Sequence, residues 1–357
     1  MQEQMFSTLG DQSVVVAGDG QMDSPGFCAK NCVYTLMHEE LNYVLHIELV
    51  DVRHSQLKSA VMERVGCERA LDFLMQKLKV DELVTDASSQ LIKLLDKRYE
   101  KVFHQLDIWH KSNKLDKKLL KACKKRKNEV LKAWIAPIRN HFWHCVKNCG
   151  GNLMKLKTEW INVLKHVTNV HTWYNGQCSH GPLNDVGERQ WINKDSAAMQ
   201  ALRDIVLDKK FLKTLPFYTR FRHTGKLEAY HSHRLMYAPK RFGFKYEGLF
   251  ARSLLAAIDH NHHLHRKQAR NAKGELVFSR RWSKRAKRWK VVIVKEKKTY
   301  SYLPVLCANL LKEASKEFMK KIKPVSSEQN PKKVAPTIAS LPAPSTSELV
   351  KEHVSRF

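Results

Sequence analysis

Two acidic residues, far apart in the sequence, have the setting that divalent-metal chemistry needs. Asp19 ends a short apolar run, Ser13–Asp19, and Asp86 ends a second expected strand, Asp81–Asp86. If these runs are neighbouring strands, the carboxylates project from the same edge of a sheet and repel one another unless a cation neutralises them. Mg²⁺ or Mn²⁺ suits such oxygen ligands, and a pair of ions stabilises the attacking and leaving oxygens of a phosphodiester displacement. The pattern therefore favours phosphodiester chemistry.

A third acid would complete the site, and Glu228 is the best candidate. It lies in a helical stretch, HTGKLEAYHSHR (223–234), among basic and aromatic residues, as a site that receives a phosphate backbone would. Asp23, in the loop after the first strand, is the alternative to Asp19 as the first acid. Taken singly, each acid has a more ordinary interpretation as a turn former or helix cap. The three in this order favour a metal site.

The elements around these acids predict an α/β fold. Further strands are expected at Cys32–Glu39 and Tyr43–Val52, joined by a hairpin, and at Val102–Trp109. Helices are expected at Gln56–Lys79 and at Ser88–Tyr99, where Ser88 or Ser89 is the N-cap. Strands and helices in this order predict a mixed β-sheet flanked by helices.

The rest of the chain divides by its pattern. Helical spacing of apolar residues dominates 111–205, which we interpret as a large, mainly helical insertion between the first part of the sheet domain (1–110) and its closing part (206–265). The closing part is expected to form helices at Phe211–Tyr237 and Lys245–His260. Residues 266–324 are basic and partly strand-like, and 325–357 are rich in Pro, Ser, Lys and Thr, which predicts disorder.

The charge of the chain points to a polyanionic partner. Lys and Arg number 63 against 35 acidic residues, a net charge of +28. Nucleic acid fits best; a membrane surface is the main rival, but no amphipathic basic helix with Trp, Phe and Leu on one face is recognisable. No run is apolar enough to span a membrane, and no signal peptide is recognisable. Eight scattered cysteines predict free thiols in a reducing compartment.

Two basic stretches are expected to contact phosphates. Between Lys111 and Lys132 there are ten basic residues and two acids, and Ser279–Lys290 interleaves basic residues with Trp282 and Trp289. The first could be an ordinary solvated helix face, and the second could be a nuclear-localisation signal. Binding through these stretches should weaken steeply with salt. The expected DNA-binding residues are Lys111, Lys114, Lys124, Lys125, Arg126, Arg280, Arg281, Lys284 and Arg285.

A zinc site is a further hypothesis for the helical insertion. Cysteine and histidine are the usual zinc ligands, and the candidates here are His144, Cys145, Cys149, Cys178 and His180. Their spacing is not that of a familiar zinc finger, so buried thiols and core histidines are the alternative.

Several stretches together resemble a known family. GDGQMDSPG and TDASSQ each follow a strand, as in the RNase H-like fold of DDE transposases, and Asp107-Ile-Trp-His110 resembles the Asp-x-x-His signature of several eukaryotic transposase superfamilies. RNHFWHC, HVTNVHTWYNGQCSHGPL, HTGKLEAYHS and YAPKRFGF with ARSLLAAIDHN are similar to the Kolobok-like transposases. The resemblance runs from Gln12 to His263.

The resemblance implies an RNase H-like core with Asp19, Asp86 and Glu228 as first, second and third metal-binding acids. Asp107 and His110 would lie close to the site, either to position a flipped nucleotide or strand end or in a structural role. Relatives of this kind often carry an upstream THAP-type DNA-binding module, for which the chain leaves no room before its first strand.

The expected function is that of a DDE transposase catalytic region in the nucleus. Water attacks a phosphodiester at a transposon end, and the released 3′-hydroxyl then attacks target DNA. Pairing of two DNA ends would suit a homodimer. The alternative is a truncated or host-adopted, non-catalytic nuclear DNA-binding protein.

Overall fold

The structure is a computed structural model that describes residues 2–24, 28–174, 176–181, 190–284 and 287–319. The predicted disordered tail, 325–357, lies outside the described residues. The chain forms two compact units. Unit 1 comprises Met1–Gln21, Tyr34–Glu48 and Gly66–His233, and unit 2 comprises Met22–Val33, Leu49–Val65 and Arg234–Phe357. No helix of the described residues is long and apolar enough to cross a membrane.

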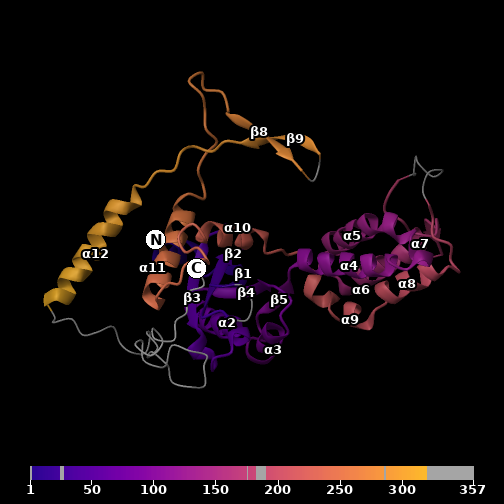
Figure 1. Ribbon diagram of the computed structural model, residues 1–357, viewed down its shortest axis with the longest axis horizontal. Coiled ribbons are helices and arrows are strands. Elements are labelled where there is room, and N and C mark those ends of the chain that lie inside the picture. Colours follow the sequence, from indigo (N-terminus) through magenta and orange to yellow (C-terminus); the bar gives the residue numbers. More distant parts are fainter. Residues whose placement is uncertain (1, 25–27, 175, 182–189, 285–286, 320–357) are drawn as a thin grey trace, which may run out of the picture. The chain divides into compact units, whose positions relative to one another are not determined.

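A mixed five-stranded sheet is the centre of the α/β fold (Figure 1). The strand order is β3-β2-β1-β4-β5, and β4 runs parallel to both β1 and β5. The strands are β1 (Ser13–Met22), β2 (Asn31–His38), β3 (Val44–Asp51), β4 (Lys79–Thr85) and β5 (Phe103–Leu106). The predicted α/β class is confirmed.

Helices that precede or follow the sheet strands pack on the sheet through apolar side chains. They are α1 (Gln2–Leu9), α2 (Ser59–Met75) and α3 (Ser89–Arg98). Leu71 and Leu74 of α2, with Leu91 of α3, bury against Val16 and Leu83 of the sheet in one hydrophobic cluster. Ser88 is the N-cap residue of α3, as predicted, although its side chain makes no capping hydrogen bond.

A separate hydrophobic cluster organises residues 108–218, which we call the helical part. It contains α4 (Ile108–Cys123), α5 (Leu131–Asn148), α6 (Leu153–Ile161), α7 (Val163–His166), α8 (Ala197–Val206) and α9 (Lys209–Lys213). It also holds three short elements, β6 (Thr172–Trp173), β7 (Gly176–Gln177) and the 3₁₀ turn η3 (Leu215–Tyr218).

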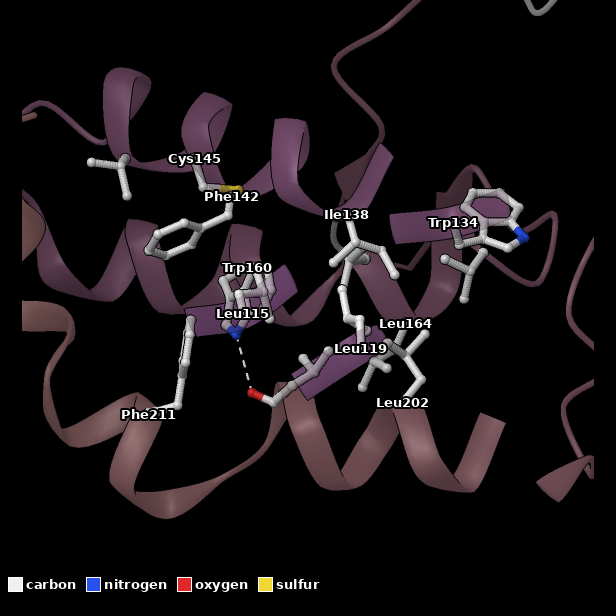
Figure 2. Packing of buried hydrophobic residues seen from close by; sticks show 14 of the residues in the cluster. Leu115, Leu119, Trp134, Ile138, Phe142, Cys145, Trp160, Leu164, Leu202 and Phe211 are labelled. Atoms are coloured by element: carbon white, nitrogen blue, oxygen red, sulfur yellow. Dashed lines mark hydrogen bonds between the residues drawn. The ribbon is translucent and has the colours of Figure 1, made fainter. Parts of the chain in front are cut away.

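Trp160 is at the centre of this second cluster, as Figure 2 shows. Its ring centroid lies 5.3 Å from that of Phe142 and 5.2 Å from that of Phe211, and its indole N–H donates to the Val206 carbonyl at 3.0 Å. A buried indole needs such an acceptor, because an unpaired N–H would cost free energy of burial. The Trp134-Ile138-Phe142 spacing of α5 gives it one continuous buried face.

Two predicted elements were wrong in detail. The strand expected to reach Trp109 ends at Leu106, because Asp107 is the N-cap of α4. The helix expected over Phe211–Tyr237 is broken: α9 ends at Lys213, η3 contains Pro216, and α10 (Gly225–Arg234) begins anew. Proline lacks the N–H that a continuous helix needs.

In unit 2, α11 (Tyr246–His262) matches the predicted helix Lys245–His260. The basic C-terminal region contains a two-stranded antiparallel ribbon of β8 (Phe278–Ser283) and β9 (Arg288–Ile293), followed by α12 (Tyr302–Met319). The sequence predicted part of this region as strand but did not predict α12.

Candidate metal centre

The first two acids lie on neighbouring parallel strands. Asp86 directly follows β4, as predicted, whereas Asp19 lies inside β1, which continues to Met22 rather than ending at the acid. In the β1–β4 register Ala17 pairs with Val84, so the same spacing brings Asp19 and Asp86 to equivalent positions. Gly18 is required here, because a Cβ at this position would lie 2.5 Å from the Tyr34 hydroxyl oxygen.

The Asp86 carboxyl has an unusual electrostatic setting. Burial, and after it the negative charge of Asp19, raise its pKa from the usual 3.8 to about 6. Its Oδ1 is buried and has no hydrogen-bond partner among the described residues. Two neighbouring carboxylates make each other's ionised form less favourable, and here one buried oxygen also lacks a partner. A bound cation would neutralise the repulsion and coordinate that oxygen.

Two histidines connect the three acids. His110 Nε2 lies 3.1 Å from Asp86 Oδ2 and 3.3 Å from Glu228 Oε1, so one nitrogen joins the second and third acids. His231 Nδ1 lies 3.2 Å from Asp19 Oδ2. Glu228 and His231 are both on α10. We call Asp19, Asp86 and Glu228, with these two histidines, the acid site; all five belong to unit 1.

The acid site is not a closed ligand cage. The group whose potential ligand atoms all lie within 4.8 Å of one another is Asp86, Asp107 and His110, and Asp19 and Glu228 are outside that group. Glu228 is also the most accessible of the three acids, with 46% of its side chain exposed, against 35% for Asp86 and 23% for Asp19. Asp86, Asp107 and His110 could therefore bind a metal ion.

Asp107 supports the acid site, besides offering a potential ligand atom beside Asp86 and His110. It is 2% exposed, and its Oδ1 accepts hydrogen bonds from the backbone N–H groups of Trp109 and His110. Its Oδ2 accepts from the Thr224 hydroxyl at 2.6 Å and the Thr224 N–H at 3.0 Å. Thr224 in turn accepts from the Glu228 N–H at 3.0 Å. Asp107 thus fixes the N-terminal ends of α4 and α10, the helices of His110 and Glu228. Of its two predicted roles, these contacts favour the structural one.

The segment leading into α10 is held by buried ion pairs that the sequence did not reveal. Glu82 of β4 is fully buried and accepts from Arg220 at 2.8 Å and Arg222 at 2.7 Å. The Ile108 N–H donates to the Arg222 carbonyl at 3.2 Å. Such pairs cost desolvation but are destabilising to break, so this segment has one well-defined path.

Asp23, the alternative first acid, is engaged elsewhere. Its carboxylate accepts from the Lys30 N–H at 3.1 Å and from the backbone and side-chain N–H groups of Asn31, each at 3.0 Å. These bonds connect the ends of β1 and β2 within unit 2. Asp19 therefore remains the preferred first acid.

The basic residues divide into exposed and buried ones. Lys111 is half-buried: its ammonium donates to the Thr214 hydroxyl at 2.6 Å and lies 3.8 Å from the centre of the Phe211 ring. Burial lowers the pKa of its ammonium to about 8, so the group is still mostly protonated at neutral pH, but it is less exposed than the other predicted DNA-binding residues. Arg285 lies outside the described residues. The other predicted DNA-binding residues are exposed: Lys114, Lys124, Lys125, Arg126, Arg280, Arg281 and Lys284.

The predicted zinc ligands do not come together as one set. Cys145 and Cys149 are buried in the helical part; Cys145 contacts His141, and Cys149 donates to the Val146 and Thr219 carbonyls. Burial raises the pKa of the Cys145 thiol far above its usual range. Cys178 and His180, however, meet two histidines that were not predicted as ligands, in the group His166, His171, Cys178 and His180.

Neither the protein-family models nor the curated proteins with which the chain was compared gave a match.

Proposed function

We propose that the chain is a metal-dependent enzyme that cuts DNA and joins the released strand end to a second DNA, of the DDE transposase type. In this proposal the sheet is an RNase H-like core, and the helical part is an insertion between β5 and α10. The observation that carries it is the meeting of Asp19 on β1, Asp86 after β4 and Glu228 on α10 around His110 and His231.

The side chains fit the metal that this chemistry uses. Asp19, Asp86 and Glu228 would hold Mg²⁺ or Mn²⁺, which would supply positive charge against the negative charge that develops on a phosphodiester during displacement. The buried, unpaired Oδ1 of Asp86 is the clearest ligand position among them. His110, when protonated, balances Asp86 and Glu228 in the absence of metal.

The surroundings of the acid site suit a nucleic-acid strand. Trp109 is 48% exposed, and its ring lies 4.9 Å from that of His110. An exposed indole beside the acids gives a base a surface on which to stack. A net charge of +28 supplies the attraction for the backbone that such binding requires.

The β8–β9 ribbon is a second DNA-binding candidate. Its register sets Arg281 opposite Lys290 and Ser283 opposite Arg288, while Trp282 pairs with Trp289. Since neighbouring residues of a strand point to opposite faces, Arg281, Lys290 and Arg288 share one basic face. The other face carries Trp282 and Trp289 together with Arg280. A two-stranded ribbon is one of the elements that a DNA groove admits.

The proposal is tested by nicking of supercoiled DNA in Mg²⁺. Asp19→Asn, Asp86→Asn and Glu228→Gln should each abolish nicking, because each removes a negative ligand while keeping its shape. Asp96→Asn on α3, where the acid is exposed, and Asp23→Asn are the matched controls and should nick like the wild type.

Two outcomes would contradict the proposal. One is wild-type nicking by Asp86→Asn. The other is a wild-type protein that binds DNA tightly in low salt but does not nick it in Mg²⁺ or Mn²⁺, which would favour the alternative of a non-catalytic DNA-binding protein.

A further inference from the structure

Three histidines and one cysteine meet at one end of the helical part. His166 ends α7, His171 directly precedes β6, Cys178 directly follows β7, and His180 comes two residues later. One potential ligand atom from each lies within 4.8 Å of all the others. We propose that this group, the His/Cys cluster, binds one structural Zn²⁺ ion.

The distances within the cluster are those of a tetrahedral zinc site. Zn–N bonds of about 2.0–2.1 Å and a Zn–S bond of about 2.3 Å at tetrahedral angles place two nitrogens about 3.3 Å apart and a nitrogen and a sulfur about 3.6 Å apart. His166 Nδ1 lies 3.3 Å from His180 Nε2 and 3.5 Å from Cys178 Sγ. The side chains therefore already stand at ligand-to-ligand spacing.

The hydrogen bonds outside the cluster orient its imidazoles. His180 Nδ1 lies 2.7 Å from the Gly181 carbonyl, which can only accept, so Nδ1 carries the proton and Nε2 presents its lone pair to the cluster. Asn169 Oδ1 lies 3.0 Å from His171 Nε2. Contacts of this kind fix the ring orientation of metal-binding histidines.

The local fold needs a cross-link of this kind. The β6–β7 hairpin has only two residues in each strand, and the Cys178 N–H donates to the His171 carbonyl at 2.8 Å. A two-stranded hairpin is marginally stable in water, so a metal bound at its base and at the end of α7 would hold it in place. Trp134 and Trp191 pack against the histidine rings, at 5.9 Å from His166 and 5.5 Å from His171.

A neighbouring group is a weaker candidate. His144, Cys145 and Glu159 also lie within 4.8 Å of one another. However, they supply three ligands rather than four, and the Cys145 sulfur is fully buried and engaged with His141 at 3.3 Å. His144 and Glu159 of this group line the same pocket as His166, Cys178 and His180, so His144 is also the natural control.

The first test is the metal content of the full chain, purified without chelators and measured by mass spectrometry of the elements. We expect about one zinc per chain, retained through dialysis against Mg²⁺. Cobalt exchanged into this site should give the absorption of tetrahedral Co²⁺ with a thiolate charge-transfer band. A chelator should remove the metal and lower the Tm.

Variants then assign the ligands. Cys178→Ser and His171→Ala should contain far less zinc, and the thiolate band of the cobalt protein should disappear in Cys178→Ser. Cys123→Ser, at the C-terminal end of α4, and His144→Ala should retain zinc fully. Measuring metal content and cobalt spectra on folded protein, checked by circular dichroism, separates loss of a ligand from loss of the fold.

A wild-type chain without zinc, or with zinc that Cys178→Ser retains and His144→Ala loses, would overturn the proposal. These readouts do not involve DNA, so they stand or fall independently of the acid site.

Discussion

The acid site and the His/Cys cluster are both in unit 1, and they offer different kinds of metal ligand. The first offers carboxylate oxygens from Asp19, Asp86 and Glu228, and the second offers three imidazoles and a thiolate. Oxygen ligands suit Mg²⁺ or Mn²⁺, whereas nitrogen and sulfur suit Zn²⁺. On these two proposals, ligand type alone would sort two metals within one chain.

The two clusters also differ in how they are held. The His/Cys cluster is local, since one stretch of chain, 166–180, supplies every ligand. The acid site depends on contacts between distant residues, such as Asp107 with Thr224 and Glu82 with Arg220 and Arg222. A local cluster can tie its own segment together, whereas an open site for a substrate needs a scaffold that is rigid beforehand.

The largest effect that we expect is in Asp86→Asn, which should disrupt the acid site and leave the His/Cys cluster unchanged. This variant should lose at least about 10³-fold in Mg²⁺-dependent nicking, since metal-ion stabilisation is worth several kcal/mol. It should keep its zinc, because no ligand of the His/Cys cluster is changed. Elemental analysis and nicking on one preparation measure both, and loss of zinc together with nicking would show that the two clusters are not separate.

Trp160→Ala should weaken the helical part more than the sheet. Removing a buried tryptophan costs about 3–5 kcal/mol and would also leave the Val206 carbonyl without its donor. Hydrogen exchange should show lost protection in 108–218 while β1 and β4 remain protected. Met154→Ala, at a side chain 68% exposed on α6, is the control; an equal loss there would contradict the central role of Trp160.

Thr224→Val should have a smaller effect that separates positioning from catalysis. It removes the hydroxyl that donates to Asp107, at a cost of about 1.5–3 kcal/mol, and should lower nicking by about ten- to a hundredfold by displacing Glu228. Thr214→Val makes the same chemical change at the Lys111 contact. If both variants lose stability but only Thr224→Val loses nicking, the Asp107–Thr224 contact positions the acid site; equal nicking in both would refute this.

The smallest effect is a pH dependence. Because folding raises the pKa of Asp86 from 3.8 to about 6, the folded protein holds this proton more tightly than the unfolded chain does. Without metal, the Asp86 contribution to the free energy of unfolding should therefore fall as pH rises from about 4 to about 6.

Mg²⁺ must displace the proton of Asp86. The increase in the free energy of unfolding that Mg²⁺ produces should therefore be small near about pH 5 and complete above about pH 7. Thermal unfolding with and without Mg²⁺ across this range measures it, and Asp86→Asn should show no such dependence. An equal Mg²⁺ effect at both ends of the range would exclude Asp86 as the titrating ligand.

The sequence predicted the parts of the fold that local patterns encode. DELVTD was predicted as a short strand ending in an acid, and β4 with Asp86 directly after it confirms this. The end of β5 was not, although Asp107 caps α4 by local hydrogen bonds from the Trp109 and His110 N–H groups, because the apolar residues around it favoured a longer strand. Pro216 was visible in the sequence but was outweighed by the helical spacing around it.

The sequence analysis proposed the three acids of the acid site but not the residues that hold them in position. His231, Thr224, Arg220 and Arg222 are defined by contacts across long stretches of chain, and no spacing in the sequence indicates them. The same holds for the zinc ligands. His166 and His171 lie in a stretch that carried the family resemblance, yet only the β6–β7 hairpin brings them to Cys178.

The most direct test of the acid site is to locate bound Mn²⁺ by anomalous diffraction from crystals of the full chain. We predict an anomalous peak in contact with Asp86 Oδ1 and with carboxylate oxygens of Asp19 or Glu228, absent in Asp86→Asn. If Mn²⁺ at millimolar concentration leaves these three carboxylates without a peak, the acid site is not a metal centre.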